Sequence, residues 1–257
     1  MKIFSVGNSY AHNAHTFLLE IAADAGVELT LLNAMIGGCS LERHVRHAKA
    51  YDKNKNDPEG SPYPVGFFKP HGCKISLRQC LQLKDWDVVT IHQASCYSFI
   101  PESYHPHAEE LIKYIRRWAP KAEIVIHETW AYRDDHPFNR SEWNGAHVDT
   151  DIMYKGLKAC YYKLAAETGF RLIPSGDAMQ KARLSKRWGM PVTEQRSLHS
   201  GDSLHLNDNG CYLAGLVWAE TLLGVDARKV KFRPDGMNED DAKILRSIAH
   251  QTAGVAK

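Results

Sequence analysis

The sequence predicts an α/β fold in which a central, mostly five-stranded parallel sheet is covered by helices on both faces. Two observations predict it. Short apolar runs that end at glycine or polar residues alternate with longer segments in which apolar residues recur every three or four positions. Strands and helices that alternate in this way form parallel βαβ units. A chain of 257 residues can bury such a core, and we expect a single domain over residues 1–257.

The first two βα units are clear in the N-terminal part of the chain. Residues 2–6 (KIFSV) predict a strand that ends at Gly7, and residues 16–25 have the apolar spacing of a helix. Residues 28–36 predict a second strand, which ends at a pair of glycines. A second helix is expected to begin near Ser40.

A polar excursion at about 51–72 then interrupts the alternation. It is rich in Lys, Asn, Asp, Pro and Gly, too polar for the core and too long for a simple connection, so we expect a surface segment near the site. The alternation resumes after it. Further strands are expected at 86–92, 122–128 and 171–174, and further helices at 103–118, 150–168, 175–188, 209–223 and 239–250.

The composition argues against several classes of partner. Lys plus Arg is 32 and Asp plus Glu is 30, so a net charge of +2 provides no strong field for nucleic acid or an anionic membrane. No run of about 20 apolar residues predicts a membrane-spanning helix. The first residues lack the pattern of a signal peptide, so the chain is expected in the cytoplasm. A secreted or periplasmic protein that has lost its signal peptide would have the same sequence.

Cofactor motifs are absent from the sequence. The six cysteines form no C-x-x-C pair, which argues against a zinc ribbon or a redox site and favours free thiols. Neither G-x-G-x-x-G nor G-x-x-x-x-G-K-[ST] occurs, so no glycine-rich loop is predicted to bind phosphates. We therefore expect neither a cofactor nor a metal.

The ends of the predicted strands carry the candidate chemistry, because ligands of an open parallel sheet bind outside the carboxyl ends of its strands. Ser9 follows the first strand at a sharp turn into a helix, where a serine is usually a helix N-cap and less often a nucleophile. A base is available in Asp202-Ser-Leu-His205. One turn of backbone can aim the carboxylate at one imidazole nitrogen and leave the other free for a serine.

Alternative interpretations of these residues stay open at this point. Asp202 could cap the following turn beside a solvated histidine. His199 is another candidate base, although no carboxylate lies three residues before it.

An oxyanion hole can be predicted from two further strand ends. Gly38 lacks a Cβ atom, so its N–H can approach a substrate oxygen closely, and one such donor contributes about 3 kcal/mol to transition-state stabilisation. Gln93 offers a side-chain amide at the end of the third strand. Together with the N–H of Ser9, these are the expected donors. Otherwise Gly38 is a turn residue and Gln93 a polar strand end.

These segments, taken together, resemble the SGNH (GDSL-like) hydrolase superfamily over nearly the whole chain. Val6-Gly7-Asn8-Ser9 looks like the opening block of the family, and Gly38 falls on its glycine donor. Asp202-Ser-Leu-His205-Leu-Asn207 is similar to its last block. The third block departs from the family's Gly-x-Asn: the chain has Ile91-His-Gln-Ala-Ser95, in which Gln93 is the substitute for the asparagine. The segments IGGCSLERH, IHQAS and TWAY look like a poorly characterised bacterial branch.

The resemblance implies a three-layer, flavodoxin-like sandwich and a serine esterase with Ser9, His205 and Asp202 as its triad. It also implies O-acyl esters as substrates, with short acyl groups and carbohydrate O-acetyl groups as leading classes. Trp130 and Tyr132 follow the fourth strand, where aromatic rings often stack on sugars. Arg43 could bind a substrate carboxylate.

Two other functions remain as alternatives. A metal-dependent hydrolase could use the pairs His12/His15 and His44/His47, whose i, i+3 spacing places two imidazoles on one helix face. However, no H-E-x-x-H is present and no carboxylate joins either pair at a familiar spacing. A non-catalytic carbohydrate-binding protein of the same fold is the second alternative, because the third block is irregular.

Overall fold

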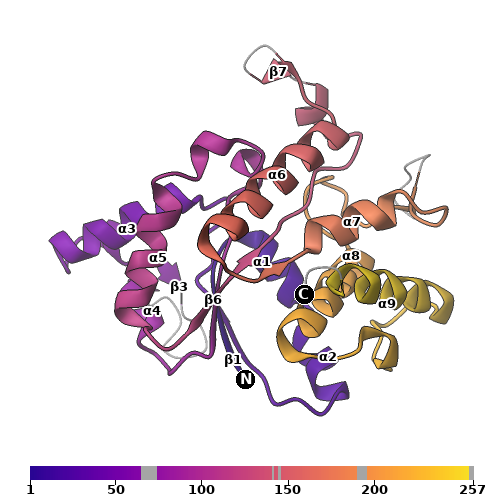
Figure 1. Ribbon diagram of the computed structural model, residues 1–257, viewed down its shortest axis with the longest axis horizontal. Coiled ribbons are helices and arrows are strands. Elements are labelled where there is room, and N and C mark those ends of the chain that lie inside the picture. Colours follow the sequence, from indigo (N-terminus) through magenta and orange to yellow (C-terminus); the bar gives the residue numbers. More distant parts are fainter. Residues whose placement is uncertain (65–73, 141, 144–145, 190–195, 255–257) are drawn as a thin grey trace.

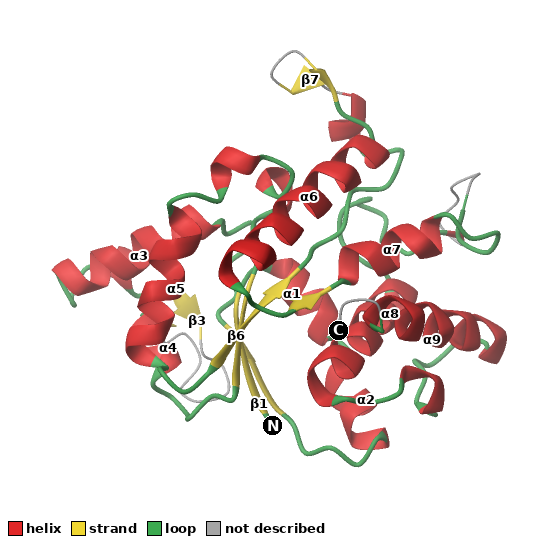
Figure 2. Cartoon of the chain, viewed as in Figure 1, coloured by secondary structure: helices red, strands yellow, loops and turns green. Residues whose placement is uncertain are grey.

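The central sheet of the computed structural model has five strands, all parallel, in the order β2-β1-β5-β6-β9. The structure describes residues 1–64, 74–140, 142–143, 146–189 and 196–254. The strands are β1 (Lys2–Val6), β2 (Thr30–Asn33), β5 (Val88–Ile91), β6 (Glu123–His127) and β9 (Leu172–Ile173). The predicted α/β class with a five-stranded parallel sheet is therefore confirmed (Figure 2). The strand order reverses at β1, so its carboxyl end is where a ligand is expected to bind.

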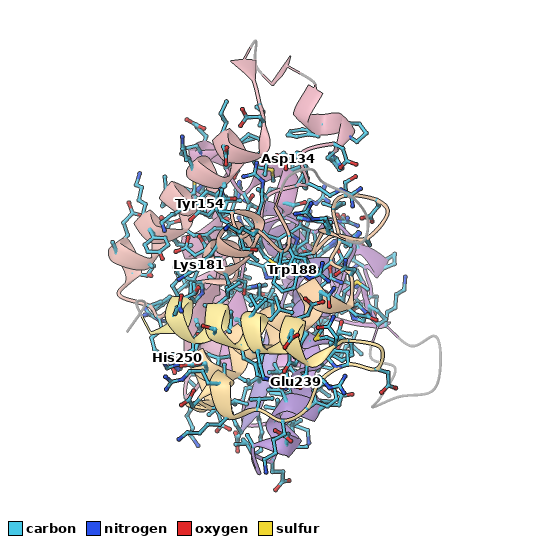
Figure 3. All side chains as sticks on the ribbon, turned by 90° about the vertical axis from the view of Figure 1, so that its right-hand side faces the viewer. Asp134, Tyr154, Lys181, Trp188, Glu239 and His250 are labelled. Atoms are coloured by element: carbon cyan, nitrogen blue, oxygen red, sulfur yellow. The ribbon has the colours of Figure 1, made fainter. Side chains whose placement is uncertain are left out.

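Helices form a layer on each side of the sheet (Figure 1). One layer contains α3 (Leu41–Lys53), α4 (Leu77–Leu81) and α5 (His107–Trp118). The other contains α1 (Ser9–His15), α2 (Leu18–Asp24), α7 (Ser175–Arg183), α8 (Asp208–Trp218) and α9 (Glu239–Ala253). Helix α6 (Thr150–Thr168) packs against β6, β9 and α7. Figure 3 shows α9 across the near side of the second layer, with Glu239 and His250 toward its two ends.

Burial on both faces of the sheet explains why the strand sequences are continuous apolar runs. Every residue of β5 is buried, and in β1 only Lys2 is exposed, because helices cover both faces of the sheet. Helix α8 is enclosed between its neighbours, and all of its residues from Gly210 to Trp218 are buried.

Helix α1 begins at Ser9, as the predicted sharp turn into a helix requires, and it is separate from the helix predicted at 16–25. The predicted helix at 16–25 is α2, and α1 lies before it, directly after the first strand. The reason is the N-cap: the side chain of Asn8 accepts a hydrogen bond from the N–H of Tyr10 and so satisfies a free donor of the first turn. Ser9 consequently lies at the first residue of a helix, and its neighbour Asn8 is the cap.

The second strand is shorter than predicted, because it stops at Asn33. The chain then makes a tight turn in which the N–H of Cys39 donates to the carbonyl of Ile36. Gly38 adopts φ +61° in this turn, a left-handed conformation that glycine accepts without strain.

The polar excursion predicted at about 51–72 is partly regular. Helix α3 continues through its first residues, and β3 (Tyr63–Pro64) pairs with β4 (Lys74–Ile75) in an antiparallel ribbon. Tyr63 is buried against His44, so this part belongs to the core and not to the surface. Residues 65–72 of the excursion lie outside the described residues.

A second two-stranded ribbon lies between β6 and α6. It pairs β7 (Glu142–Trp143) with β8 (Ala146–His147), and it projects from the body of the molecule (Figure 1). In the described part of the chain, no helix combines the length and apolarity needed to cross a membrane. The five cysteines described there, Cys39, Cys80, Cys96, Cys160 and Cys211, are free.

Candidate active site

The turn from β1 into α1 holds Ser9 by a dense set of hydrogen bonds around Asn8. The Asn8 backbone N–H donates to Nε2 of His92 at 3.3 Å, and its side-chain amide donates to the carbonyl of Cys39 at 3.1 Å. The carbonyl of Asn8 accepts from the side chain of Asn33 at 3.3 Å. The residue before Ser9 is therefore anchored to the exits of β2 and β5, and Ser9 itself is half-buried.

Ser9, His205 and Asp202 form a continuous hydrogen-bonded line. Nε2 of His205 lies 2.8 Å from Oγ of Ser9, and Nδ1 of His205 lies 2.6 Å from Oδ2 of Asp202. Because an ionised carboxylate only accepts, Nδ1 carries the proton and Nε2 is left to accept from the serine hydroxyl. The structure thus brings together the three residues predicted as a triad, in the order that proton transfer requires.

The loop around Asp202 is organised by the carboxylate itself. Oδ1 of Asp202 accepts hydrogen bonds from the N–H groups of Leu204 and His205, each at 2.9 Å, and from the Ser200 hydroxyl at 2.7 Å. Partial burial alone would raise the pKa of Asp202, but the hydrogen bonds from His205, Leu204 and Ser200 outweigh it and hold the pKa below its usual value. Asp202 is therefore a carboxylate whenever the protein is folded near neutral pH.

Arg133 connects the loop around Asp202 to the segment that follows β6. Its guanidinium donates to the carbonyl of Ser200 at 3.0 Å and forms a bidentate pair with Asp135. Its backbone N–H donates to the carbonyl of Ser203, a residue held at φ +61°. No sequence motif signalled this role, because the contact joins residues about seventy positions apart.

Trp130 packs between Tyr10 and the backbone of Leu204 and does not reach solvent. It is fully buried, its ring stacks on Tyr10 at a centroid distance of 4.1 Å, and its indole N–H donates to the carbonyl of Leu204 at 3.2 Å. The predicted contact of Trp130 with substrate is thus not supported, because the side chain is fully buried and its indole N–H donates to the protein.

The turn that contains Gly38 is hydrogen-bonded to the turn between β1 and α1, which contains Ser9. Besides the bond from Asn8 to Cys39, the N–H of Ile36 donates to the carbonyl of Gly7. Within the described residues, the backbone N–H groups of Ser9 and Gly38 donate no hydrogen bond to protein. Two free donors on two joined turns are the arrangement that an oxyanion hole needs.

Gln93 does not occupy the predicted position of a third donor. Its side-chain oxygen accepts from the N–H groups of Leu41 at 3.0 Å and Ala94 at 2.9 Å. Since both of these groups are donors, the atom facing them must be the amide oxygen. The amide nitrogen then donates to the carbonyl and hydroxyl of Ser103, and the residue is buried. Gln93 is a cross-link between α3 and the loop after β5.

Tyr132 and Arg43 also differ from the prediction. Tyr132 is 4% exposed, and its hydroxyl lies 3.0 Å from that of Ser95. Nε of Arg43 donates to His47, whose other ring nitrogen lies 2.7 Å from the carbonyl of Glu59. Arg43 is thus directed along α3 toward its carboxyl end, and no described contact joins it to Ser9.

Three of the four histidines considered as metal ligands, His15, His44 and His47, have hydrogen-bond partners inside the protein. Nε2 of His15 lies 3.0 Å from the Ser5 hydroxyl, and Nδ1 of His44 lies 2.9 Å from the Tyr63 hydroxyl. Across the described ranges, the only group of three ligands close enough to share an ion is Glu220, Asp226 and His250. It contains no member of either pair, and Arg228 and Lys229 pair with Asp226.

His199, the other candidate base, contacts the backbone after β6 and has no described contact with Ser9. Its Nε2 lies 3.0 Å from the carbonyl of Ala131, and burial lowers its pKa to about 4. His205 is the histidine that the fold places against Ser9.

The arrangement of the central sheet and its helices is the α/β fold that solved SGNH hydrolases also have. The structure is similar to a candidate SGNH hydrolase from Slackia heliotrinireducens, with 21% identity, a TM-score of 0.58 and coverage of 86% of this chain and 98% of that chain. It is also similar to the psychrotrophic esterase EstA from Pseudoalteromonas sp., with 13% identity, a TM-score of 0.53 and coverage of 87% and 97%. The resemblance inferred from the sequence blocks is thereby confirmed for the fold.

The chain belongs to the DUF4886 family, described as a domain of unknown function, whose sequence profile matches residues 2–252. A crystal structure of a DUF4886 family protein from Bacteroides uniformis ATCC 8492 is 28% identical, with a TM-score of 0.80 and coverage of 98% of this chain and 93% of that chain. No curated protein matches the sequence.

Proposed function

We propose that this protein is a serine esterase that hydrolyses short O-acyl esters. One observation carries the proposal: the unbroken line from Asp202 through His205 to Ser9, with distances of 2.6 and 2.8 Å. This geometry supports proton removal from the serine hydroxyl by a neutral imidazole that a carboxylate holds in the required tautomer.

The reaction follows from these positions. Oγ of Ser9 forms a bond to the ester carbonyl carbon while its proton passes to Nε2 of His205. The carbonyl oxygen takes the negative charge and accepts hydrogen bonds from the free N–H groups of Ser9 and Gly38. When the C–O bond to the alcohol breaks, His205 returns the proton to the leaving alkoxide. Water then attacks the acyl-enzyme with the same histidine as base, which releases the acid and restores Ser9.

The exposure of the site favours a hydrophilic alcohol. The His205 side chain is 34% exposed and that of Asp202 is 49% exposed, so the triad lies at the surface and not at the bottom of an apolar tunnel. A surface site admits a bulky polar alcohol such as a sugar and gives little apolar contact to a long acyl chain. We therefore propose acetylated carbohydrates as the leading substrate class.

Replacement of Ser9 by alanine tests the esterase proposal. The wild-type protein is expected to hydrolyse 4-nitrophenyl acetate and acetylated sugars faster than esters with longer acyl chains, and Ser9→Ala is expected to abolish this activity. Ser247→Ala, which changes a serine on α9, is the control and should retain it. A fluorophosphonate should add one label per wild-type chain and none to Ser9→Ala. Sugar binding without turnover or labelling would favour the carbohydrate-binding alternative.

A further inference from the structure

The hydroxyl groups of Ser95 and Tyr132 form an isolated pair at the exit of β5. Their oxygen atoms lie 3.0 Å apart, and in the described part of the chain the Tyr132 hydroxyl has no other hydrogen-bond partner. Tyr132 is 4% exposed, and burial raises the pKa of its phenol to about 12, so it remains protonated. A buried phenol needs an acceptor for its proton, and Ser95 is the one available.

The direction of this hydrogen bond leaves the Ser95 proton unused. If Tyr132 donates to Ser95, the serine oxygen acts as acceptor and its own O–H must point elsewhere. The Ser95 hydroxyl donates no other hydrogen bond within the described residues, so its proton is available to a third group.

Ser95 lies next to the nucleophile turn. Strands β1 and β5 are parallel neighbours with Val6 beside Ile91, so the residues that follow them leave the sheet side by side. Gly7 contacts His92 one step further on. The ring centroid of Tyr10, which follows Ser9 directly, is 6.3 Å from that of His205. Ser95 is half-buried, whereas its neighbours Gln93 and Ala94 are buried.

We propose that the Ser95 hydroxyl, oriented by Tyr132, donates a hydrogen bond to the carbonyl oxygen of the substrate and completes the oxyanion hole in place of Gln93. This inference rests on the proposed esterase function. Ser95 is then a catalytic residue, because it touches the reacting oxygen, and Tyr132 is a positioning residue that acts through it. The bond strengthens as charge develops on the oxygen, so it lowers the barrier more than it tightens substrate binding.

Steady-state kinetics with 4-nitrophenyl acetate test this role. Ser95→Ala is expected to lower kcat by about 10²- to 10³-fold, the effect of removing one oxyanion donor, and to leave KM within a few-fold of the wild type. Ser95→Thr keeps a hydroxyl and is expected to recover most of the activity. Tyr132→Phe is expected to lower kcat less, because Ser95 remains but is no longer oriented.

The double variant separates an indirect role from an independent one. If Tyr132 acts through Ser95, Ser95→Ala with Tyr132→Phe has the same kcat as Ser95→Ala alone. Tyr97→Phe, an exposed tyrosine in the same turn as Ser95, is the matched control and should have wild-type kcat. Urea midpoints of all variants show whether a loss of activity comes from unfolding.

Each result has a distinct meaning. Wild-type kcat in folded Ser95→Ala, while Ser9→Ala is inactive, would overturn the role of Ser95 and leave the esterase proposal intact. A higher KM with wild-type kcat in Ser95→Ala would also overturn the role of Ser95. Absence of any hydrolysis that depends on Ser9 would overturn both proposals.

Discussion

Gly7 and His92 are packed so closely that a Cβ atom on Gly7 would lie 2.4 Å from Cε1 of His92. The imidazole that fills this space accepts the N–H of Asn8, the residue before the proposed nucleophile. Burial lowers the pKa of His92 to about 3, so the ring is neutral and can serve as an acceptor. The glycine before Asn8-Ser9 is therefore required by packing against a neighbouring strand exit, whatever the reaction.

Gly7→Ala should destabilise the protein through this contact. The methyl group would force His92 or the turn to move, and overpacking of this kind costs about 1–3 kcal/mol. We expect a lower urea midpoint with an unchanged m-value. Gly37→Ala is the matched control, because nothing lies within 4 Å of the position of its Cβ atom. Equal midpoints for the two variants would contradict the packing argument.

Asp202→Asn should remove most of the activity and leave the fold intact. Asparagine keeps an oxygen for the N–H groups of Leu204 and His205, but its NH₂ group would face Nδ1 of His205 and favour the wrong tautomer. The same change in a serine protease triad lowers kcat about 10⁴-fold, and we expect a loss of this order. Asp208→Asn, on the exposed first turn of α8, is the control in the same assay. A kcat for Asp202→Asn within tenfold of the control would argue against the triad.

Gln93→Leu should reduce stability because the residue is a cross-link. Leucine has a similar size but leaves the buried N–H groups of Leu41 and Ala94 without an acceptor. Unsatisfied buried groups cost about 1–3 kcal/mol each, so the free energy of unfolding is expected to fall by at least about 2 kcal/mol. Gln82→Leu, an exposed position, should change it little. Unaltered stability with a large loss of kcat would instead restore Gln93 as an oxyanion donor.

Buried histidines should make the protein sensitive to acid. Burial lowers the pKa of His44 and His92 to about 3, and it lowers that of His127 well below its ordinary value. In the unfolded chain these groups bind protons near pH 6.5, so between pH 6.5 and 3 the unfolded state binds more protons than the folded state. Stability should therefore fall as the pH falls below 6.5, by up to about 1.4 kcal/mol per pH unit for each residue.

His127→Leu tests the origin of this dependence. Neither ring nitrogen of His127 has a hydrogen-bond partner in the described structure, so the variant loses no hydrogen bond. Between pH 6 and 4, the slope of the unfolding free energy against pH should be smaller in His127→Leu than in the wild type. The expected difference corresponds to one bound proton, about 1.4 kcal/mol per pH unit. His12→Leu, at an exposed position, should keep the wild-type slope. An unchanged slope in His127→Leu would show that the acid sensitivity has another source.

The sequence alone determined the α/β class, the five parallel strands and the three residues of the candidate triad. These features are encoded locally, because apolar periodicity marks each strand and helix and Asp202 reaches His205 within one turn of backbone. Ser9 and Gly38 could be identified because each lies in the turn that follows a strand. The separation of 196 positions between Ser9 and His205 did not prevent the prediction, because Asp202 and His205 form a local pattern of their own in the loop before α8.

Only the tertiary structure decided where the side chains at those exits point. Gln93 turns toward Ser103, Trp130 is enclosed under Leu204, and the hydroxyl of Ser95 meets that of Tyr132, 37 positions away. A strand end places a residue at the edge of the site, but the direction of its side chain depends on which distant donors and acceptors remain to be satisfied. That balance depends on contacts between separate segments, and no local pattern in the sequence records it.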